Sequence, residues 1–340
     1  MTPKERFYNR LAGKPVDKIP NLNIVMQFAA QHIGAPYGKF CADYRCLVEA
    51  QQRTAIDFGI DILSTMSDPF RETHDFGARI RFPEDGLPIC EEAFLTGPED
   101  LPKLKLFDPM ASARVLDRIR AVELFKRNLG DEYPVLGWVE APFAEFCDLT
   151  TVNDAMMLLY DEPAMVEDAL ELIIEQEIRC ANAQIAAGAD VIGMGDAVAS
   201  LVSPDTYREL CMAAEARVIE AAHAQGAVVK LHICGNINHI LEDVIRAGAD
   251  IVDIDFMVDF DRAIALSQGK CSISGHINPV NVLYQGTAED VARRTRFCVE
   301  HGDGRSFVSG GCEAPRYTPE ENLRAVDEEL RRIASAGLPR

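Results

Sequence analysis

The chain alternates between short apolar runs and longer stretches in which apolar positions recur every three or four residues. Eight runs have the length of a buried strand: residues 19–26, 59–66, 133–141, 189–196, 227–235, 249–256, 270–278 and 306–312. Helical patterns lie between or after the later runs, over residues 161–187, 204–225, 236–248, 287–301 and 318–336. This alternation predicts repeated strand–helix units, which build a parallel sheet.

A short phrase marks three of the helix-to-strand junctions. It places a glycine before an aspartate and an apolar run, at Gly59-Ile60-Asp61, Gly188-Ala189-Asp190 and Gly248-Ala249-Asp250. Glycine is typical of a helix end because it accepts a left-handed backbone conformation. Eight strands joined in this way predict an α/β fold in which one (β/α)8 TIM barrel takes up the whole chain, residues 1–340.

The segment between the second and third predicted strands, residues 67–132, is too long for a simple connection. Within it, the pattern of residues 78–94 indicates a hairpin around Glu84-Asp85-Gly86. Active sites of such barrels lie where the strands end at their carboxyl side. We therefore expect residues 67–132 to form an insertion over the barrel mouth.

Composition and charge argue against nucleic acid and membranes as partners of this protein. The chain is 48% hydrophobic and 26% charged, and its formal net charge is -20. This charge, without any cluster of lysine and arginine, argues against nucleic acid as a partner. No apolar stretch has the length of a membrane span or a secretory signal. The ten cysteines are scattered and form no Cys-x-x-Cys pair, which indicates reduced thiols. We therefore expect a cytoplasmic protein that does not bind membranes.

The sequence His232-Ile233-Cys234 ends the fifth predicted strand. Alternate residues of a strand point to the same face, so His232 and Cys234 aim at one point. Cys312 ends the eighth strand, and the turn Gly310-Gly311 before it would carry its side chain inward. Nitrogen and sulfur are zinc ligands, and three protein ligands leave the fourth position open to substrate. The alternative is that His232 and Cys234 are core residues, because buried free cysteine is common.

A site of this composition would activate a thiol. One neutral imidazole and two thiolates roughly balance the charge of Zn(II). A substrate thiol that binds fourth would therefore lose its proton and yet remain electron-rich. The predicted product is a thiolate nucleophile at neutral pH.

Other acidic residues fall at the same predicted rim. Glu140 lies near the end of the third strand and Asp196 at the end of the fourth. Asp253 and Asp255 share a face of the sixth strand, where they would hold a cation or orient a ligated histidine. Glu140 or Glu313 would fill the fourth zinc position until substrate displaces it.

His276 and Asn278 end the seventh predicted strand, and we place both among the candidate cofactor-binding residues. Each has another interpretation. Asn278 stands before Pro279 and suits a helix cap. His276 suits a partner of the metal ligands or a hydrogen-bonded core residue.

Several segments resemble the uroporphyrinogen decarboxylase superfamily, and the likeness covers nearly the whole chain. The segments are Thr2-Pro3-Lys4-Glu5-Arg6-Phe7 with Val16-Asp17-Lys18-Ile19-Pro20, Gly195-Asp196-Ala197-Val198-Ala199-Ser200-Leu201-Val202-Ser203-Pro204, and Gly310-Gly311-Cys312-Glu313-Ala314-Pro315 before Thr318-Pro319-Glu320-Glu321-Asn322. Within the superfamily, His-x-Cys followed much later by Cys resembles the zinc methyltransferase branch, typified by methylcobamide:coenzyme M methyltransferases. The resemblance implies His232, Cys234 and Cys312 as ligands.

The resemblance also implies a reaction and its partners. In such enzymes a zinc-bound thiolate attacks a methyl group on the cobalt of a corrinoid protein, and related members move a methyl group from a small donor to the corrinoid. It implies Zn(II) and a corrinoid as cofactors, a corrinoid protein and a small thiol or methyl donor as partners, and a homodimer. Ser67-Asp68 resembles the catalytic aspartate segment of the decarboxylase, although Asp68 also suits a turn or cap.

Departures from the decarboxylase separate the alternatives. Residues 26–32 lack the arginine-rich stretch that grips porphyrinogen carboxylates, and Cys312 stands where the decarboxylase has a histidine. The alternatives are porphyrinogen decarboxylation, methyl transfer from folate as in cobalamin-independent methionine synthases, and a non-catalytic protein, with structural zinc or as a chaperone of a corrinoid partner. We predict a zinc-dependent corrinoid methyltransferase. The predicted catalytic residues are Asp68, Asp196 and Asp255, the cofactor-binding residues are Asn278 and His276, and the metal ligands are His232, Cys234, Cys312 and Glu140.

Overall fold

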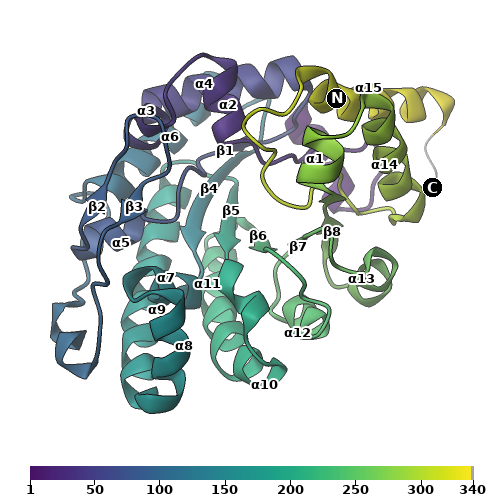
Figure 1. Ribbon diagram of the computed structural model, residues 1–340. Helices are drawn as coiled ribbons and strands as arrows, with labels where there is room; N and C mark the ends of the chain where they lie inside the picture. The colour runs from purple at the N-terminus through teal and green to yellow at the C-terminus, as the bar shows by residue number, and fades with distance from the viewer. Residues whose placement is uncertain (338–340) are drawn as a thin grey trace.

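A parallel sheet forms the centre of the computed structural model, which describes residues 1–337 (Figure 1). Its six strands follow the order β1-β4-β5-β6-β7-β8, and every neighbouring pair is parallel. The strands are β1 (Leu63–Ser64), β4 (Val135–Glu140), β5 (Val191–Gly195), β6 (Val228–Ile233), β7 (Ile251–Ile254) and β8 (Ser272–Ser274). Each lies inside one of the predicted apolar runs, so the α/β fold with a parallel sheet is confirmed.

The first and last predicted strands are shorter than the sequence indicates. β9 (His276–Ile277) pairs with β10 (Ser309–Gly310), and Asn21 forms an isolated parallel bridge with Val308. The amide of Asp61 donates to the carbonyl of Asn21 at 2.8 Å. Pro20 has no N–H to give to a ladder, and the backbone amide of Asn23 donates to the side chain of Asn21 at 3.1 Å, so a single bridge forms where residues 19–26 were predicted to form a strand. The regular sheet therefore has six strands rather than eight.

Helices surround the sheet and supply its outer layer (Figure 1). The longer ones are α1 (Pro3–Leu11), α4 (Tyr44–Phe58), α6 (Arg114–Leu129), α7 (Pro142–Leu149), α8 (Val152–Asp161), α9 (Pro163–Ala186), α11 (Met212–Ala224), α13 (Phe260–Ser267), α14 (Ala288–His301) and α15 (Glu320–Ala336). The shorter helices and turns are α2 (Gln27–His32), α3 (Tyr37–Ala42), α5 (Arg71–Phe76), η1 (Pro98–Lys103), η2 (Ala197–Leu201), α10 (Pro204–Thr206), η3 (Tyr207–Cys211), α12 (Leu241–Arg246) and η4 (Pro279–Tyr284). The pattern at 204–225 thus covers three consecutive pieces, with the π-helical turn η3 between α10 and α11.

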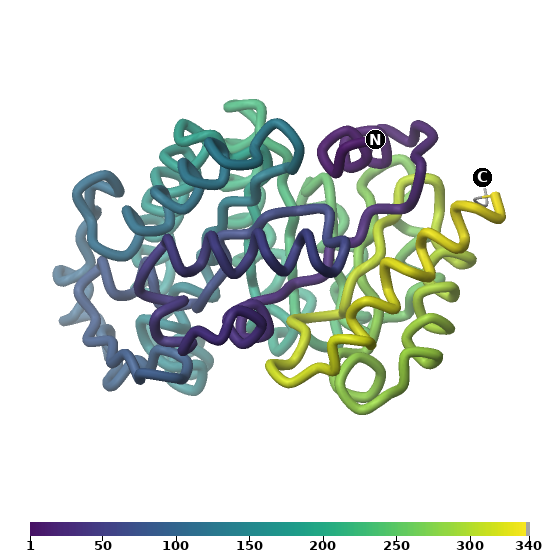
Figure 2. The backbone as a smooth tube through the Cα atoms, turned by 90° about the horizontal axis from the view of Figure 1, so that it is seen from above, coloured from purple at the N-terminus to yellow at the C-terminus, as the bar shows by residue number. Residues whose placement is uncertain are grey.

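The two ends of the described chain lie on the same side of the molecule, as the purple and yellow segments of Figure 2 show. Lys18 pairs with Asp327 of α15 and lies 3.1 Å from Asp61. Strands β4, β5 and β7 are buried along their whole length, as expected for a parallel sheet that is covered on both faces. Within residues 1–337, no helix combines the length and the hydrophobicity that crossing a lipid bilayer requires.

The predicted hairpin is present. β2 (Ile80–Arg81) pairs with β3 (Ile89–Cys90) in antiparallel register. The Asp85 carboxylate at its turn accepts the amide of Tyr37 at 2.9 Å and two hydrogen bonds from Arg316 at 2.8 and 2.9 Å. Gly38 allows the close approach, because a Cβ there would lie 2.1 Å from the carbonyl oxygen of Pro83. The hairpin is thus fastened to segments near both ends of the chain.

Buried carboxyl groups lie between α5, α6, α9 and β4. Arg118 donates to Glu72 at 2.6 Å and to the carbonyl of Trp138 at 3.0 Å. Glu177 is fully buried, and within residues 1–337 neither of its carboxylate oxygens has a hydrogen-bond partner. Burial, with the nearby Glu72 charge, raises the pKa of Glu177 well above its ordinary value. The proton on Glu177 therefore stabilises the folded protein.

Replacement of Glu177 by glutamine should raise the melting temperature at alkaline pH. A group whose pKa is raised in the folded state contributes stability that is complete below its ordinary pKa of 4.5 and is lost as the pH rises towards the folded value. The amide carries no proton to lose, so we expect a Tm increase of about 2 °C near pH 8 and little difference near pH 4. Thermal unfolding over this pH range measures it. Glu167→Gln, at an exposed position of α9, is the matched control, and equal pH profiles for the two variants would contradict the assignment.

Candidate metal centre

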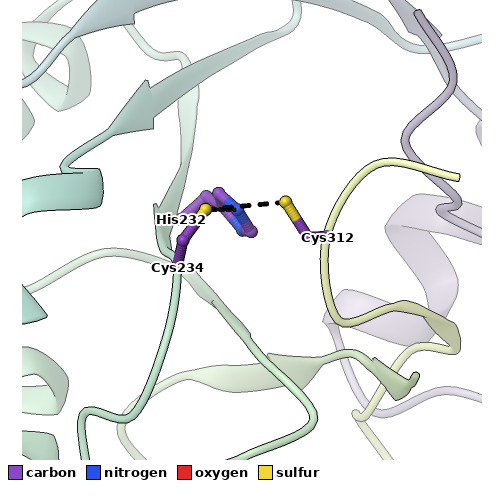
Figure 3. A group of neighbouring side chains, drawn as sticks. All are labelled: His232, Cys234 and Cys312. Carbon is purple, nitrogen blue, oxygen red and sulfur yellow. Dashed lines mark hydrogen bonds between the residues drawn. The ribbon is translucent and has the colours of Figure 1, made fainter. Parts of the chain in front are cut away.

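Three side chains from two sides of the fold meet at the carboxyl end of the sheet (Figure 3). His232 lies in β6 and Cys234 just after it, whereas Cys312 follows β10. The Nε2 atom of His232 lies 2.9 Å from the sulfur of Cys234, and the two sulfurs lie 3.5 Å apart. One ligand atom from each residue lies within 4.8 Å of the others. The structure thus brings together the three residues that the sequence predicted to converge.

Glycines make this convergence possible. Gly235 follows Cys234 with a φ of +87°, a left-handed conformation that most residues avoid. A Cβ on Gly311 would lie 2.5 Å from the amide nitrogen of Phe256. Only a glycine therefore lets the segment before Cys312 pass this close to the end of β7, and the turn carries Cys312 inward as predicted.

Asp253 holds the imidazole of His232 from the adjacent strand. The two residues are register partners in β6 and β7, and Nδ1 of His232 lies 2.9 Å from the Asp253 carboxylate. Burial alone would raise the pKa of Asp253, but Lys230, with its ammonium 2.6 Å away, and His232 hold it well below its ordinary value. An ionised carboxylate at Nδ1 keeps the proton there and directs Nε2 towards the sulfurs.

The sequence prediction selected Asp255 for a catalytic role, and the structure gives the contact with the histidine to its neighbour Asp253. The carboxylate of Asp255 accepts the backbone amides of Gly235 at 2.8 Å and Phe256 at 2.6 Å. It therefore shapes the turn after Cys234. Strand alternation puts both aspartates on one face, and only the register with β6 decides which of them meets His232.

The two thiols share their protons unequally. A hydrogen bond from Cys234 lowers the pKa of Cys312 to about 4, although burial acts in the other direction. The same hydrogen bond, together with burial, raises the pKa of Cys234. The pair thus holds one thiolate by itself, and a cation would replace the remaining proton, since thiolates are the metal-binding form.

The three side chains line a cavity of about 160 Å³. Its other walls are mainly apolar and include Ile24, Met26, Met66 and Trp138. Three carboxyl side chains, Asp68, Glu140 and Glu313, also reach it. The predicted metal ligands therefore face a space in which a small molecule can bind.

Asp68 enters the cavity wall as an ionised and paired carboxylate. Arg114 donates to it at 2.8 Å and the hydroxyl of Ser67 at 2.7 Å. Burial acts to raise the pKa of Asp68, but Arg114 and Arg71 lower it overall. The residue is at the site, as predicted, and its catalytic role stays a prediction.

Glu140 and Glu313 also line the cavity, but they lie away from the three converging ligand atoms. Glu140 accepts a hydrogen bond from the indole N–H of Trp138 at 2.7 Å, and burial raises the pKa of Glu140 well above its ordinary value. Glu313 accepts a hydrogen bond from the backbone amide of Gln27 at 2.6 Å, and burial raises the pKa of Glu313 to about 7. Among the described residues, neither belongs to the group within 4.8 Å. That either fills a fourth metal position stays a prediction.

Asp196, His276 and Asn278 do not belong to the described residues that line the cavity. Asp196 is buried beside it, and its amide donates to the carbonyl of His232 at 3.0 Å. His276 contacts Arg294 and the carbonyl of Val258, and burial lowers the pKa of His276 to about 4. Asn278 caps η4. Their predicted catalytic and cofactor-binding roles stay predictions without support from this geometry.

The apolar wall is the part of the site that the sequence analysis missed. Trp138 is the only tryptophan in the chain and is 4% exposed. In the sequence it resembles any core residue of a buried strand. Its spacing from Glu140 was the available signal, because residues two apart share a face of a strand.

The chain is similar to known proteins over almost its full length. The model of the uroporphyrinogen decarboxylase (URO-D) family matches residues 2–333. The methylcobamide:CoM methyltransferase MtbA of Methanosarcina mazei is 26% identical, with 96% of this chain and 97% of that protein covered. The methylcobamide:CoM methyltransferase MtaA of Methanosarcina barkeri is 27% identical, with 96% of both chains covered.

A solved structure agrees with these matches in its fold. The structure described as a methyltransferase from Methanosarcina mazei superimposes with a TM-score of 0.89 at 23% identity, and it covers 98% of this chain and 99% of that one. At this identity the likeness shows the fold. Because the family model matches nearly all of the chain, the protein belongs to the uroporphyrinogen decarboxylase (URO-D) family.

Proposed function

We propose that the protein is a zinc-dependent methyltransferase that moves a methyl group from a corrinoid to a small thiol. The observation that carries this proposal is the convergence of His232, Cys234 and Cys312 at the wall of a cavity. The printed activity of the similar MtbA and MtaA proteins supports the corrinoid as methyl donor.

The donor set suits zinc that takes part in chemistry. One imidazole nitrogen and two sulfurs are ligands of the kind that zinc prefers, and structural zinc sites are closed by four protein ligands. Within residues 1–337, no fourth His, Cys, Asp or Glu atom joins the cluster. The arrangement therefore supports an open site over a structural one.

Each residue at the site has a distinct task in this proposal. When bound, zinc would lower the pKa of the substrate thiol and thus supply a thiolate nucleophile at neutral pH. Asp253 holds the proton of His232 on Nδ1, 2.9 Å away, so that Nε2 is free to ligate. Ile24, Met66 and Trp138 exclude water from the side of the cavity where the thiol and the methyl group would meet. A dry site keeps the nucleophile reactive.

Several finer features belong to the same proposal. The links at Asn21, Val308 and β10 support closure of the sheet into an eight-unit barrel. Of the predicted insertion, residues 67–132, the part before α6 would then lie over its mouth, where a corrinoid protein would dock, whereas α6 packs against α4 and β4 in the outer layer. We also propose a cytoplasmic location and a homodimer, as the sequence analysis expects.

Metal analysis and a methyl-transfer assay test the proposal together. We expect about one zinc ion per chain and demethylation of methylcobalamin that depends on an added thiol. No carbon dioxide should be released from uroporphyrinogen, because the cavity wall offers no Lys or Arg among the described residues to bind its carboxylates. Full demethylase activity in zinc-free protein would refute the proposal.

A further inference from the structure

Residues 1–337 offer no free cation at the cavity beside His232. No lysine or arginine is among the described residues that line it. Two cations near the site are already engaged: Arg114 donates to Asp68 of the cavity wall at 2.8 Å, and Lys230 lies 2.6 Å from Asp253, which contacts His232. An anionic group on a substrate would therefore find no partner of opposite charge.

The neutral donors at the cavity are engaged as well. The indole N–H of Trp138 donates to Glu140 at 2.7 Å. The backbone amide of Gln27 donates to Glu313 at 2.6 Å. Both donors point to a carboxyl group, so neither of these N–H groups is free for an anion at this wall. An anionic group there would lose its hydration without a hydrogen bond from either N–H group in return.

The charge of the metal centre adds to this discrimination. Two thiolates and a neutral imidazole cancel the charge of Zn(II), so a bound substrate thiolate makes the centre negative. A second negative charge on the same small molecule would lie close to the first, inside a mainly apolar wall. Like charges at short range in such surroundings repel strongly.

We propose that the cavity selects an uncharged small thiol and discriminates against thiols that carry an anionic group. This inference rests on the proposed methyltransferase function and names its substrate class. Coenzyme M is the 2-mercaptoethanesulfonate anion, so the chain would differ in its acceptor from the CoM methyltransferases that it resembles. With an uncharged thiol, the only negative charge that the substrate places in the cavity is that of its thiolate sulfur.

Three thiols with the same two-carbon backbone test the inference on the zinc-loaded protein. They are 2-mercaptoethanol, 2-mercaptoethanesulfonate and cysteamine, and each rate is corrected for its uncatalysed reaction with methylcobalamin. We expect kcat/KM for mercaptoethanol to exceed that for the sulfonate by at least about tenfold. Equal or faster reaction of the sulfonate would overturn the inference, and so would a preference for cysteamine. Failure of every thiol would instead refute the methyltransferase function.

A binding measurement and a charge-inserting variant give independent support. Mercaptoethanol should raise the Tm of the zinc-loaded protein more than the sulfonate does, and the reverse order would count against the inference. Met66→Lys places an ammonium at the cavity wall and should shift the kcat/KM ratio towards the sulfonate by about tenfold. Met157→Lys, at a position that is 62% exposed, should keep the wild-type ratio. If Met66→Lys does not fold, the comparison of the three thiols on the wild-type protein still tests the preference for an uncharged thiol.

Discussion

Replacement of Cys312 by alanine is expected to abolish both zinc binding and methyl transfer. The change removes one of the two sulfurs and leaves His232 and Cys234, both from the end of β6, as the remaining converging donors. It also removes the one converging donor that follows β10 within residues 1–337. We expect the zinc content and the rate of methylcobalamin demethylation to fall by about 100-fold or more, since even indirect changes around a metal cost 10–100-fold. Elemental analysis and the demethylation assay measure the two losses.

The control for this variant is another buried cysteine. Cys271 is 1% exposed and lies before β8, outside the group of converging ligand atoms. Cys271→Ala should keep its zinc and its activity, although it creates a cavity of similar size. A Cys312→Ala protein that folds, lacks zinc and still turns over at the wild-type rate would exclude the proposed role of the metal.

Replacement of Asp253 by asparagine is expected to weaken zinc binding without removing any ligand. The asparagine amide cannot supply the negative charge that holds the proton of His232 on Nδ1. Loss of such a partner costs about 10–100-fold in metal affinity. Competition with a chelator measures this loss, and saturating zinc should restore most of the activity. A purely structural role would not respond to added zinc.

Lys230 complicates the Asp253→Asn variant and also provides its control. Its ammonium is buried 2.6 Å from Asp253, so the single variant leaves a buried charge without a counterion. Such a change is strongly destabilising. Lys230→Met in the same chain removes that charge, and the double variant should regain stability but not zinc affinity. Asp255→Asn should change zinc affinity much less, because Asp255 accepts backbone amides. If Asp255→Asn matched Asp253→Asn, the assignment of the orienting contact would be wrong.

The fold was predictable where local signals coincide. The runs that became β5 and β7 combine β-branched residues with a preceding glycine and aspartate, so the strand type and its position follow from the sequence. At residues 19–26 the apolar pattern is as strong, but Pro20 removes a donor and only one bridge forms. The helices α1 to α8 were not predicted, although the buried positions of α4 recur with the period of a helix. Their positions depend on tertiary contacts, such as the fastening of the hairpin by Arg316.

The site was predictable only as far as strand geometry reaches. Alternation places His232 beside Cys234, and the glycine turn brings in Cys312. The choice between Asp253 and Asp255 depends on the register of two strands, which no local pattern encodes. Asn278 and His276 end a predicted strand, yet a helix cap and a contact with Arg294 take up their side chains. Position at a strand end therefore predicts a site residue less well than membership in a set of nitrogen and sulfur donors that suit one metal ion.

The short distance between the sulfurs of Cys234 and Cys312 has a consequence for where such a protein can work. They lie 3.5 Å apart although 78 positions separate them in sequence, and a disulfide needs about 2.05 Å. When no cation holds them, an oxidant such as dioxygen can withdraw two electrons and join the two sulfurs, with release of the one proton that the thiol–thiolate pair still holds. The resulting cystine has no thiolate to offer, so exposure to air would leave the apoprotein unable to bind zinc until a reductant reopens the bond.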